Sequence, residues 1–263
     1  MSIFRKDDLH TYYEITGKGT PVLFIHGLGS STEDWEYQVP AFSEHHKVIT
    51  YDVRGHGRSS KSPPPYSIRA FAQDTAELIR HLDLGPMHVV GISMGGMIGL
   101  ELALDHPAMI RSLTICNAGP CLQLKGISGR LMLATRLSIM HLMGMKAVGK
   151  KLAREMFPKP SQVELRQKVK NRWARNDTKS YAAAVRAIVE WNVENRLQEL
   201  TVPILVVKGD ADKTPSEMTD EHIARMFDAR KVVIADSMHA TPVDQPEAFN
   251  EKVLDFISHI DNR

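Results

Sequence analysis

Short, continuous apolar runs rich in β-branched residues constrain the fold of this chain most strongly. Residues 21–25 (PVLFI), 47–51 (KVITY) and 87–92 (MHVVGI) are such runs, and a polar residue follows each one. Runs of this length are typical of strands buried on both faces, as in a parallel sheet. Residues 67–83 carry apolar positions at helical spacing. The alternation predicts an α/β fold, with helices on the faces of a mostly parallel sheet.

The pattern changes in the middle of the chain. After a strand-like segment at 112–118, residues 127–192 show helical spacing and no convincing strand. Strand signals return at 203–208 and 231–235, and an amphipathic helix follows them. A helical insertion therefore interrupts the α/β pattern.

We accordingly predict two parts. Residues 1–118 and 201–263 form the α/β core, and residues 119–200 form a helical cap. The cap contains a methionine-rich stretch that includes Met140 and Met143. Such a stretch is typical of a helix packed on the core, and its adaptable thioethers also suit the wall of a hydrophobic substrate pocket.

Composition excludes several classes of protein. The 33 basic and 31 acidic residues give a formal charge of +2, which offers no case for binding nucleic acid or an anionic membrane. Cys116 and Cys121 are too few for a disulfide framework, and no Cys/His set has the spacing of zinc ligands. No apolar run is long enough to span a bilayer. Charged residues in the opening MSIFRKDD precede any apolar stretch, so we expect no signal peptide and a cytoplasmic location.

A G-x-S-x-G motif occupies residues 91–95, directly after the third apolar run. The run predicts a strand before the motif, and the sequence GGMIGLELAL predicts a helix after it. A sharp strand-to-helix turn exposes a serine hydroxyl at the carboxyl edge of the sheet, where ligands bind in open α/β folds. We therefore predict Ser93 as the nucleophile.

A serine hydroxyl is a poor nucleophile until a base takes its proton. The chain has 12 histidines. His239 is the favoured base because it lies in a loop between the strand at 231–235 and the last helix. A loop at the carboxyl end of a strand can reach Ser93.

The base needs a carboxylate that fixes its tautomer. Asp210 and Asp212 both follow the strand at 203–208. We favour Asp212, because two further residues into the loop increase its reach, whereas Asp210 would brace the loop. Asp236 is a weaker alternative, with a role in a turn. The resulting order of serine, acid and histidine along the chain is that of α/β hydrolases.

Two backbone amides complete the predicted site. The N–H of Met94 follows the nucleophile at the start of a helix, where the dipole favours negative charge. The second donor should come from the glycine-containing loop after residues 21–25, and we assign it to the N–H of Leu28. His26 in the same loop is interpreted as a structural histidine.

These segments together resemble the α/β-hydrolase superfamily over nearly the whole chain. The resemblance implies an eight-stranded, mostly parallel sheet flanked by helices, a helical cap between strands six and seven, and neither a cofactor nor a metal. The family's D-x-R-G-x-G-x-S loop is mainly structural, so we give Asp52, Arg54 and His56 no catalytic role. The residues that carry the resemblance are HGLGSS at 26–31, DVRGHGRS at 52–59, GISMGG at 91–96, GDADKTPS at 209–216 and SMHATPVDQPEAF at 237–249.

The resemblance leaves the substrate open. We favour hydrolysis of carboxylic esters or lactones of small to medium hydrophobic substrates, because residues 91–99 resemble the elbow of enol-lactone hydrolases. The alternative is a carbon–carbon hydrolase of ring-cleavage dienoic acids. Those relatives often carry Asn before the nucleophile, where this chain has Ile92. Arg186 and Trp191 could still hold a carboxylate and a diene, and Trp191 is a further candidate for the pocket wall.

Two other functions remain open. A haloperoxidase-like or perhydrolase activity often accompanies the same triad. Some members of the superfamily are non-enzymatic ligand-binding proteins, but those often lose triad residues, and this chain keeps all three. The expected partner is a small-molecule ester or lactone, and the sequence does not indicate an oligomeric state.

Overall fold

A single mixed sheet forms the centre of the computed structural model, which describes residues 2–122 and 126–263. Its strand order is β1-β2-β4-β3-β5-β6-β7-β8. The β1–β2 and β2–β4 pairs are antiparallel, and every later pair is parallel. The strands are β1 (Ser2–Lys6), β2 (Leu9–Thr16), β3 (Pro21–Ile25), β4 (Lys47–Tyr51), β5 (Met87–Ile92), β6 (Ile110–Cys116), β7 (Ile204–Gly209) and β8 (Ala229–Ile234).

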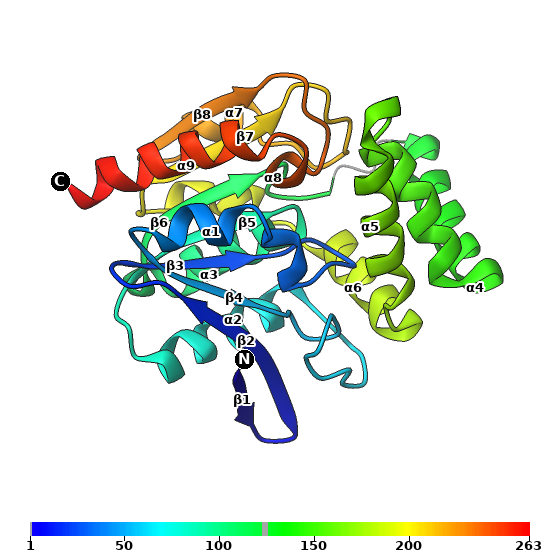
Figure 1. Cartoon of the computed structure of the whole chain (residues 1–263), viewed down its shortest axis with the longest axis horizontal. Coiled ribbons are helices and arrows are strands. Elements are labelled where there is room, and N and C mark those ends of the chain that lie inside the picture. The colour runs from blue at the N-terminus through cyan, green and yellow to red at the C-terminus, as the bar shows by residue number, and fades with distance from the viewer. Residues whose placement is uncertain (1, 123–125) are drawn as a thin grey trace.

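Helices cover both faces of the sheet, which explains why the strand runs are apolar without interruption (Figure 1). On β3, Leu23 and Ile25 pack into one core cluster, while Val22 and Phe24 pack into the other. The first cluster includes residues of α2 and α3, and the second includes residues of α1 and α9. These helices are α1 (Gln38–Ser43), α2 (Ile68–Leu82), α3 (Met94–Asp105) and α9 (Pro246–Asp261), and the short α7 (Asp220–Ala224) and α8 (Thr241–Asp244) lie in loops near β8.

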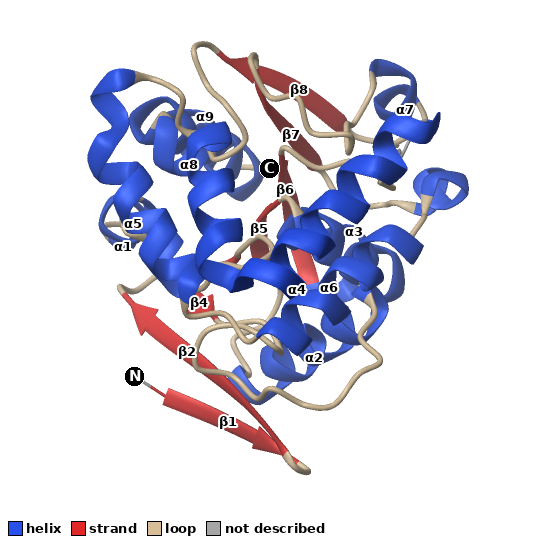
Figure 2. Cartoon of the chain, turned by 90° about the vertical axis from the view of Figure 1, so that its right-hand side faces the viewer, coloured by secondary structure: helices blue, strands red, loops and turns tan. Residues whose placement is uncertain are grey.

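The segment between β6 and β7 is helical. Figures 1 and 2 show α4 (Gly126–Met156), α5 (Val163–Ala174) and α6 (Thr178–Glu190) packed together at one end of the sheet, and we call these three the cap helices. The backbone of α4 breaks at Gly144, where φ is 73°. A third core cluster joins the cap helices to Ala240 and Val243 near α8. Residues 123–125 of the predicted 119–200 insertion lie outside the described residues.

The predicted α/β architecture, an eight-stranded and mostly parallel sheet flanked by helices, is confirmed. The sequence did not predict β1, whose residues are almost all exposed and which pairs with β2 at the edge of the sheet. No helix among the residues that the structure describes combines the length and the apolar character needed to cross a bilayer.

Candidate active site

Ser93 stands in a strained turn between β5 and α3. Its φ of 54° and ψ of −119° lie in a region that non-glycine residues rarely adopt. The turn is possible because its neighbours lack side chains. A Cβ on Gly91 would lie 2.3 Å from the Gly95 carbonyl oxygen, and one on Gly95 would lie 2.0 Å from that of Ile25. The strand and the helix therefore approach closely, and Ser93 sits at the carboxyl edge of the sheet.

His239 and Asp212 meet at the same edge. His239 lies in the loop between β8 and α8, and its Nδ1 is 3.1 Å from Oδ2 of Asp212 in the loop after β7. The carboxylate also accepts hydrogen bonds from the backbone N–H and the hydroxyl of Thr214, at 3.0 and 2.9 Å. Burial alone would raise the pKa of Asp212, but the contacts with His239 and Thr214 outweigh it and hold that pKa below its ordinary value. Asp212 is therefore ionised at neutral pH, and Nδ1 of His239 carries the proton that it donates.

The other two acids in this region have different partners. Asp210 accepts a hydrogen bond from the backbone N–H of Ser237 at 3.0 Å, which joins the two loops that precede and follow β8. Asp236 forms an ion pair with Lys159, with 2.6 Å between Nζ and Oδ2. Neither contact involves the His239 ring.

Asn117 connects these loops and was not predicted from the sequence. It follows β6 with a φ of 47°, and its side chain is buried. Its Oδ1 accepts a hydrogen bond from the Gly209 amide at 2.9 Å. Its Nδ2 donates to the carbonyl of His239 and to the hydroxyl of Thr241, both at 2.8 Å. One side chain thus braces the ends of two strands and the backbone of the histidine loop.

Of the two predicted amide donors, Met94 directly follows Ser93 in the chain, and Leu28 lines the same cavity as Ser93. Met94 is the first residue of α3, so its N–H has no acceptor within the helix. Leu28 belongs to residues 26–30, which we call the oxyanion loop after the role that the sequence predicts for the Leu28 amide. Within that loop, a Cβ on Gly27 would lie 3.5 Å from the Ser93 Cβ, so the loop passes directly over the serine.

His26 fixes the start of the oxyanion loop. Its Nε2 accepts a hydrogen bond from the Val53 amide at 2.9 Å, and its Nδ1 donates to the Gly27 carbonyl at 2.8 Å. Burial lowers the pKa of His26, so the ring stays neutral. A neutral ring with both nitrogens occupied has a structural role, as the sequence analysis proposed.

A cavity of about 510 Å³ opens onto these groups, between the sheet edge and the cap helices. Its wall is largely apolar, and the polar side chains of Ser93, His239 and Asp212 are part of it. The cap contributes the aliphatic and aromatic side chains Val148, Leu152, Met156, Phe157, Val169, Trp173, Val185, Ile188 and Val189. A site of this volume and polarity suits a small hydrophobic ligand with a few oriented polar atoms.

Comparison with known proteins agrees with this geometry. A family model for the alpha/beta hydrolase fold matches residues 20–246. The chain belongs to the alpha/beta hydrolase family. It is 30% identical over 260 residues to a protein of Azorhizobium caulinodans provisionally named carbamate hydrolase RutD, covering 97% of each chain.

Two further comparisons concern enol-lactonases. The chain is 26% identical over 235 residues to the 3-oxoadipate enol-lactonase 2 of Acinetobacter baylyi, covering 88% of this chain and 86% of that one. The crystal structure of the enol-lactonase from Burkholderia xenovorans superposes with a TM-score of 0.90 at 24% identity, covering 98% of this chain and 100% of that one. The two sequence relatives support a hydrolase activity for this alpha/beta hydrolase, and the solved structure supports its fold.

The structure corrects the predicted pocket residues of this alpha/beta hydrolase. Met143 is 69% exposed on α4 and faces away from the cavity, while Met140 is buried in the cluster between the cap helices. The Trp191 indole donates to the buried carboxylate of Glu101 at 2.6 Å. None of the three belongs to the cavity wall. Helical spacing alone did not show which face of α4 would turn toward the site.

The clamp that Arg186 and Trp191 could have provided for a ring-cleavage dienoic acid, under the alternative function, is not formed. Arg186 is exposed on α6 and lies outside the cavity wall. Trp191 is hydrogen-bonded to Glu101, and neither Trp191 nor Arg186 lines the cavity that contains Ser93.

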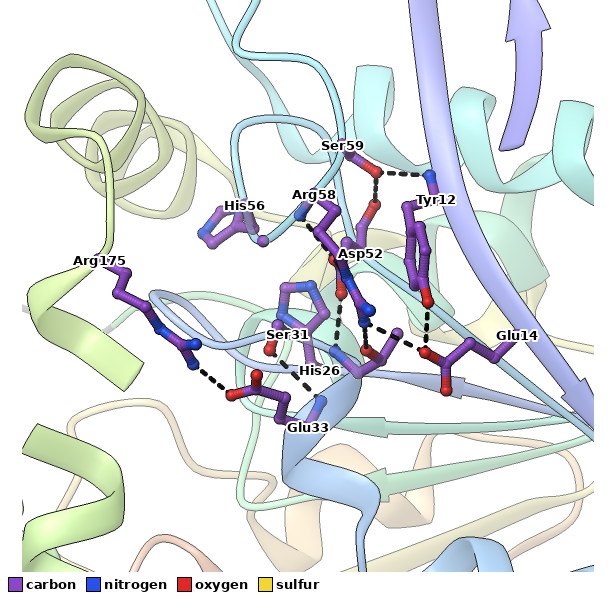
Figure 3. A network of polar contacts seen from close by, with 12 residues as sticks. Tyr12, Glu14, His26, Ser31, Glu33, Asp52, His56, Arg58, Ser59 and Arg175 are labelled. Atoms are coloured by element: carbon purple, nitrogen blue, oxygen red, sulfur yellow. Dashed lines mark hydrogen bonds and ion pairs between the residues drawn. The ribbon is translucent and has the colours of Figure 1, made fainter. Parts of the chain in front are cut away.

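The D-x-R-G-x-G-x-S loop of this alpha/beta hydrolase, residues 52–59, is hydrogen-bonded to the segment that directly follows the oxyanion loop (Figure 3). The fully buried Asp52 accepts hydrogen bonds from the amides of Thr32 and Arg58, at 2.8 and 2.7 Å. Arg54 pairs with Asp74. Burial lowers the pKa of His56 to about 3, so its ring is neutral. These contacts are structural, and within the described ranges no three His, Cys, Asp or Glu side chains gather as metal ligands do.

Proposed function

We propose that this alpha/beta hydrolase is a serine hydrolase that cleaves carboxylic esters or lactones of small to medium hydrophobic substrates. The observation that carries the proposal is the 3.1 Å contact between His239 Nδ1 and Asp212 Oδ2, in a cavity whose wall also includes the strained Ser93. That contact leaves Nε2 of His239 as the proton acceptor, which is the tautomer that a catalytic base requires.

The first half of the reaction forms an acyl-enzyme. The Ser93 hydroxyl attacks the substrate carbonyl while His239 takes its proton, and Asp212 stabilises the resulting imidazolium. The carbonyl oxygen becomes an oxyanion that accepts hydrogen bonds from the amides of Leu28 and Met94. The imidazolium then protonates the leaving alkoxide, which departs as the alcohol, or as the hydroxyl end of an opened lactone.

The second half restores the enzyme. His239 removes a proton from a water molecule, the hydroxide attacks the ester carbonyl of the acyl-enzyme, and the carboxylic acid leaves as Ser93 regains its proton. The same two amides hold the second oxyanion. No step needs a metal or an organic cofactor.

The apolar wall of the cavity supports a hydrophobic acyl or alcohol group. The relatives named as enol-lactonases favour lactones among the possible esters. The relative with the carbamate hydrolase name suggests a related acyl compound as a second class to be tested. Because Arg186 and Trp191 lie outside the cavity wall, a carbon–carbon hydrolase is less well supported.

A rate screen on one preparation tests the proposal. We expect turnover of p-nitrophenyl esters of short and medium acids and of aliphatic lactones, and little turnover of a ring-cleavage dienoic acid. The same screen with Ser93→Ala serves as the control. Turnover of the dienoic acid alone, or ester turnover that persists without Ser93, would reject the assignment.

A further inference from the structure

The oxyanion loop is held from two sides. From the core, His26 Nε2 accepts a hydrogen bond from the Val53 amide at 2.9 Å. From the cap, Asn176 in the turn between α5 and α6 donates from Nδ2 to the Gly29 carbonyl at 2.7 Å. Leu28 lies between these two attachment points. The orientation of its amide therefore depends on the cap as well as on the core.

Packing reinforces the attachment at Gly29. A Cβ on Gly29 would lie 3.1 Å from a ring carbon of Tyr181 and 3.2 Å from ring carbons of Trp173. The φ of Gly29 is +75°, a conformation that side chains other than glycine rarely adopt. The aromatic pair of the cap thus lies in direct contact with the backbone of the loop, and a shift of these rings would displace the loop.

Arg172 on α5 provides the second link. Its guanidinium has one carboxylate on each nitrogen: Glu33 at 3.2 Å from Nε, Asp34 at 3.1 Å from Nη1 and Glu36 at 3.1 Å from Nη2. The Arg172 side chain is only 13% exposed, so solvent screens these pairs less than it screens ordinary surface pairs. Asp34 also accepts a hydrogen bond from the hydroxyl of Ser30, the last residue of the loop.

Two other cations near Arg172, Lys168 on α5 and Arg175 directly after it, lack this link. Arg175 pairs with Glu33, as Figure 3 shows, and Lys168 pairs with Glu36 at 3.0 Å. Both side chains are more exposed than that of Arg172, and in the described part of the chain neither pairs with Asp34, the carboxylate that accepts a hydrogen bond from Ser30 of the oxyanion loop. Arg172 and Asn176 thus differ from Lys168 and Arg175 in their connection to residues 26–30.

We propose that Asn176 and Arg172 are positioning residues that hold the Leu28 amide where the oxyanion forms. The cap then contributes to catalysis through the core loop as well as by enclosing the substrate. This inference rests on the proposed function, because it takes Leu28 as an oxyanion donor. An oxyanion donor displaced by a fraction of an ångström binds the transition state less well and leaves ground-state binding nearly unchanged.

Asn176→Leu tests the proposal, since leucine has a similar size, carries no charge and cannot donate to Gly29. We expect kcat on a p-nitrophenyl ester to fall about 10- to 100-fold, less than or equal to the loss of a whole oxyanion donor, while KM changes by less than about 2-fold. Affinity for an alkyl boronic acid, which forms a tetrahedral adduct on serine, should fall in step with kcat. Affinity for the product carboxylic acid should not change.

Arg175→Gln is the matched control, because it removes an exposed ion pair from the residue next to Asn176 and should leave kcat within about 2-fold. Arg172→Met and Arg172→Lys form a second, independent pair of variants. We expect kcat to fall with Met, while Lys, which keeps the charge but loses the fork, restores part of it. If circular dichroism shows that Asn176→Leu is unfolded, the two Arg172 variants test the proposal in its place.

Three outcomes would overturn the inference: folded Asn176→Leu or Arg172→Met variants with wild-type kcat, losses confined to KM, or boronic acid affinity that does not follow kcat. Failure of the proposed function would look different. In that case the wild type itself would show no ester turnover that depends on Ser93, and the inference would fall with it.

Discussion

The protein holds two arrays of the same three residue types, serine, histidine and aspartate, at opposite edges of one sheet. At the carboxyl edge, Asp212 contacts His239 beside Ser93. At the amino edge, Nδ1 of His88 is 2.7 Å from the Ser112 hydroxyl, and its Nε2 is 3.0 Å from Asp261 at the end of α9. By connectivity alone, the second array resembles a catalytic triad as closely as the first.

The two arrays differ in backbone conformation, in burial and in access to a cavity. Ser93 has a φ of 54° at a strand-to-helix turn and lies in the wall of a cavity of about 510 Å³. Ser112 is a regular residue of β6 and is 1% exposed, and the His88 ring is completely buried. No substrate could reach Ser112. A strained turn and an open cavity, rather than the identity of the hydrogen-bonding partners, separate a candidate active site from a structural clamp.

The largest effect should come from the two serines. We expect Ser93→Ala to lower kcat on short acyl esters by about 10⁴-fold or more. Ser112→Ala should leave kcat within a few fold, because the buried array has no role in catalysis. Steady-state kinetics of both variants decide the point. Comparable losses would mean that the comparison is wrong.

The aspartate variants should differ in kcat almost as much as the two serine variants. Asp212→Asn should lower kcat by about 10³- to 10⁴-fold, because an amide would leave His239 in the wrong tautomer. Asp210→Asn and Asp261→Asn serve as controls, with kcat losses expected to stay well below that. If Asp210→Asn proved as damaging as Asp212→Asn, the acid would be misassigned.

A smaller effect is expected at Asn117, which braces only the array at the carboxyl edge. Asn117→Asp keeps the size of the side chain and an acceptor for Gly209 but loses the donor to the His239 carbonyl. We expect kcat to fall about 10-fold, with a loss of roughly 1–3 kcal/mol in unfolding free energy. Asn262→Asp, at the exposed end of α9, is the matched control. An Asn117 variant with full activity would show that the brace is not needed.

The smallest effect concerns pH. Burial lowers the pKa of His88, outweighing the attraction of Asp261. In the unfolded chain His88 takes up a proton near pH 6.5, whereas in the folded chain it stays neutral to lower pH. The free energy of unfolding therefore falls as the pH drops below about 6.5. His26 and His56 act in the same direction. Denaturant titrations at pH 7.5 and 5 should show a loss that is about 1 kcal/mol smaller in His88→Gln. An equal loss in both proteins would exclude His88 as a contributor.

Much of the fold could be predicted from the sequence, because strands buried on both faces leave continuous apolar runs. The strand β1 could not be predicted in this way, because Ser2–Lys6 is almost entirely exposed and contains no continuous apolar run. The motif before α3 indicated the strained turn at Ser93, and glycines at 91 and 95 supplied its chemical reason.

The remaining features depend on distant contacts. Asn117 is one polar residue after a strand, and nothing local indicates that it reaches the loop of His239. The exposure of Met143 depends on which face of α4 packs against the rest of the protein, and that is set by tertiary contacts. The carboxylates that surround Arg172 follow the oxyanion loop in sequence but meet α5 only in the folded chain.

Labelling with a fluorophosphonate, followed by mass spectrometry of the intact protein and its peptides, tests the central claim most directly. The account predicts one adduct per chain, located on Ser93, with none on Ser112 and none on the Ser93→Ala variant. A folded protein that takes up no probe, or that carries its adduct on another residue, would contradict the account.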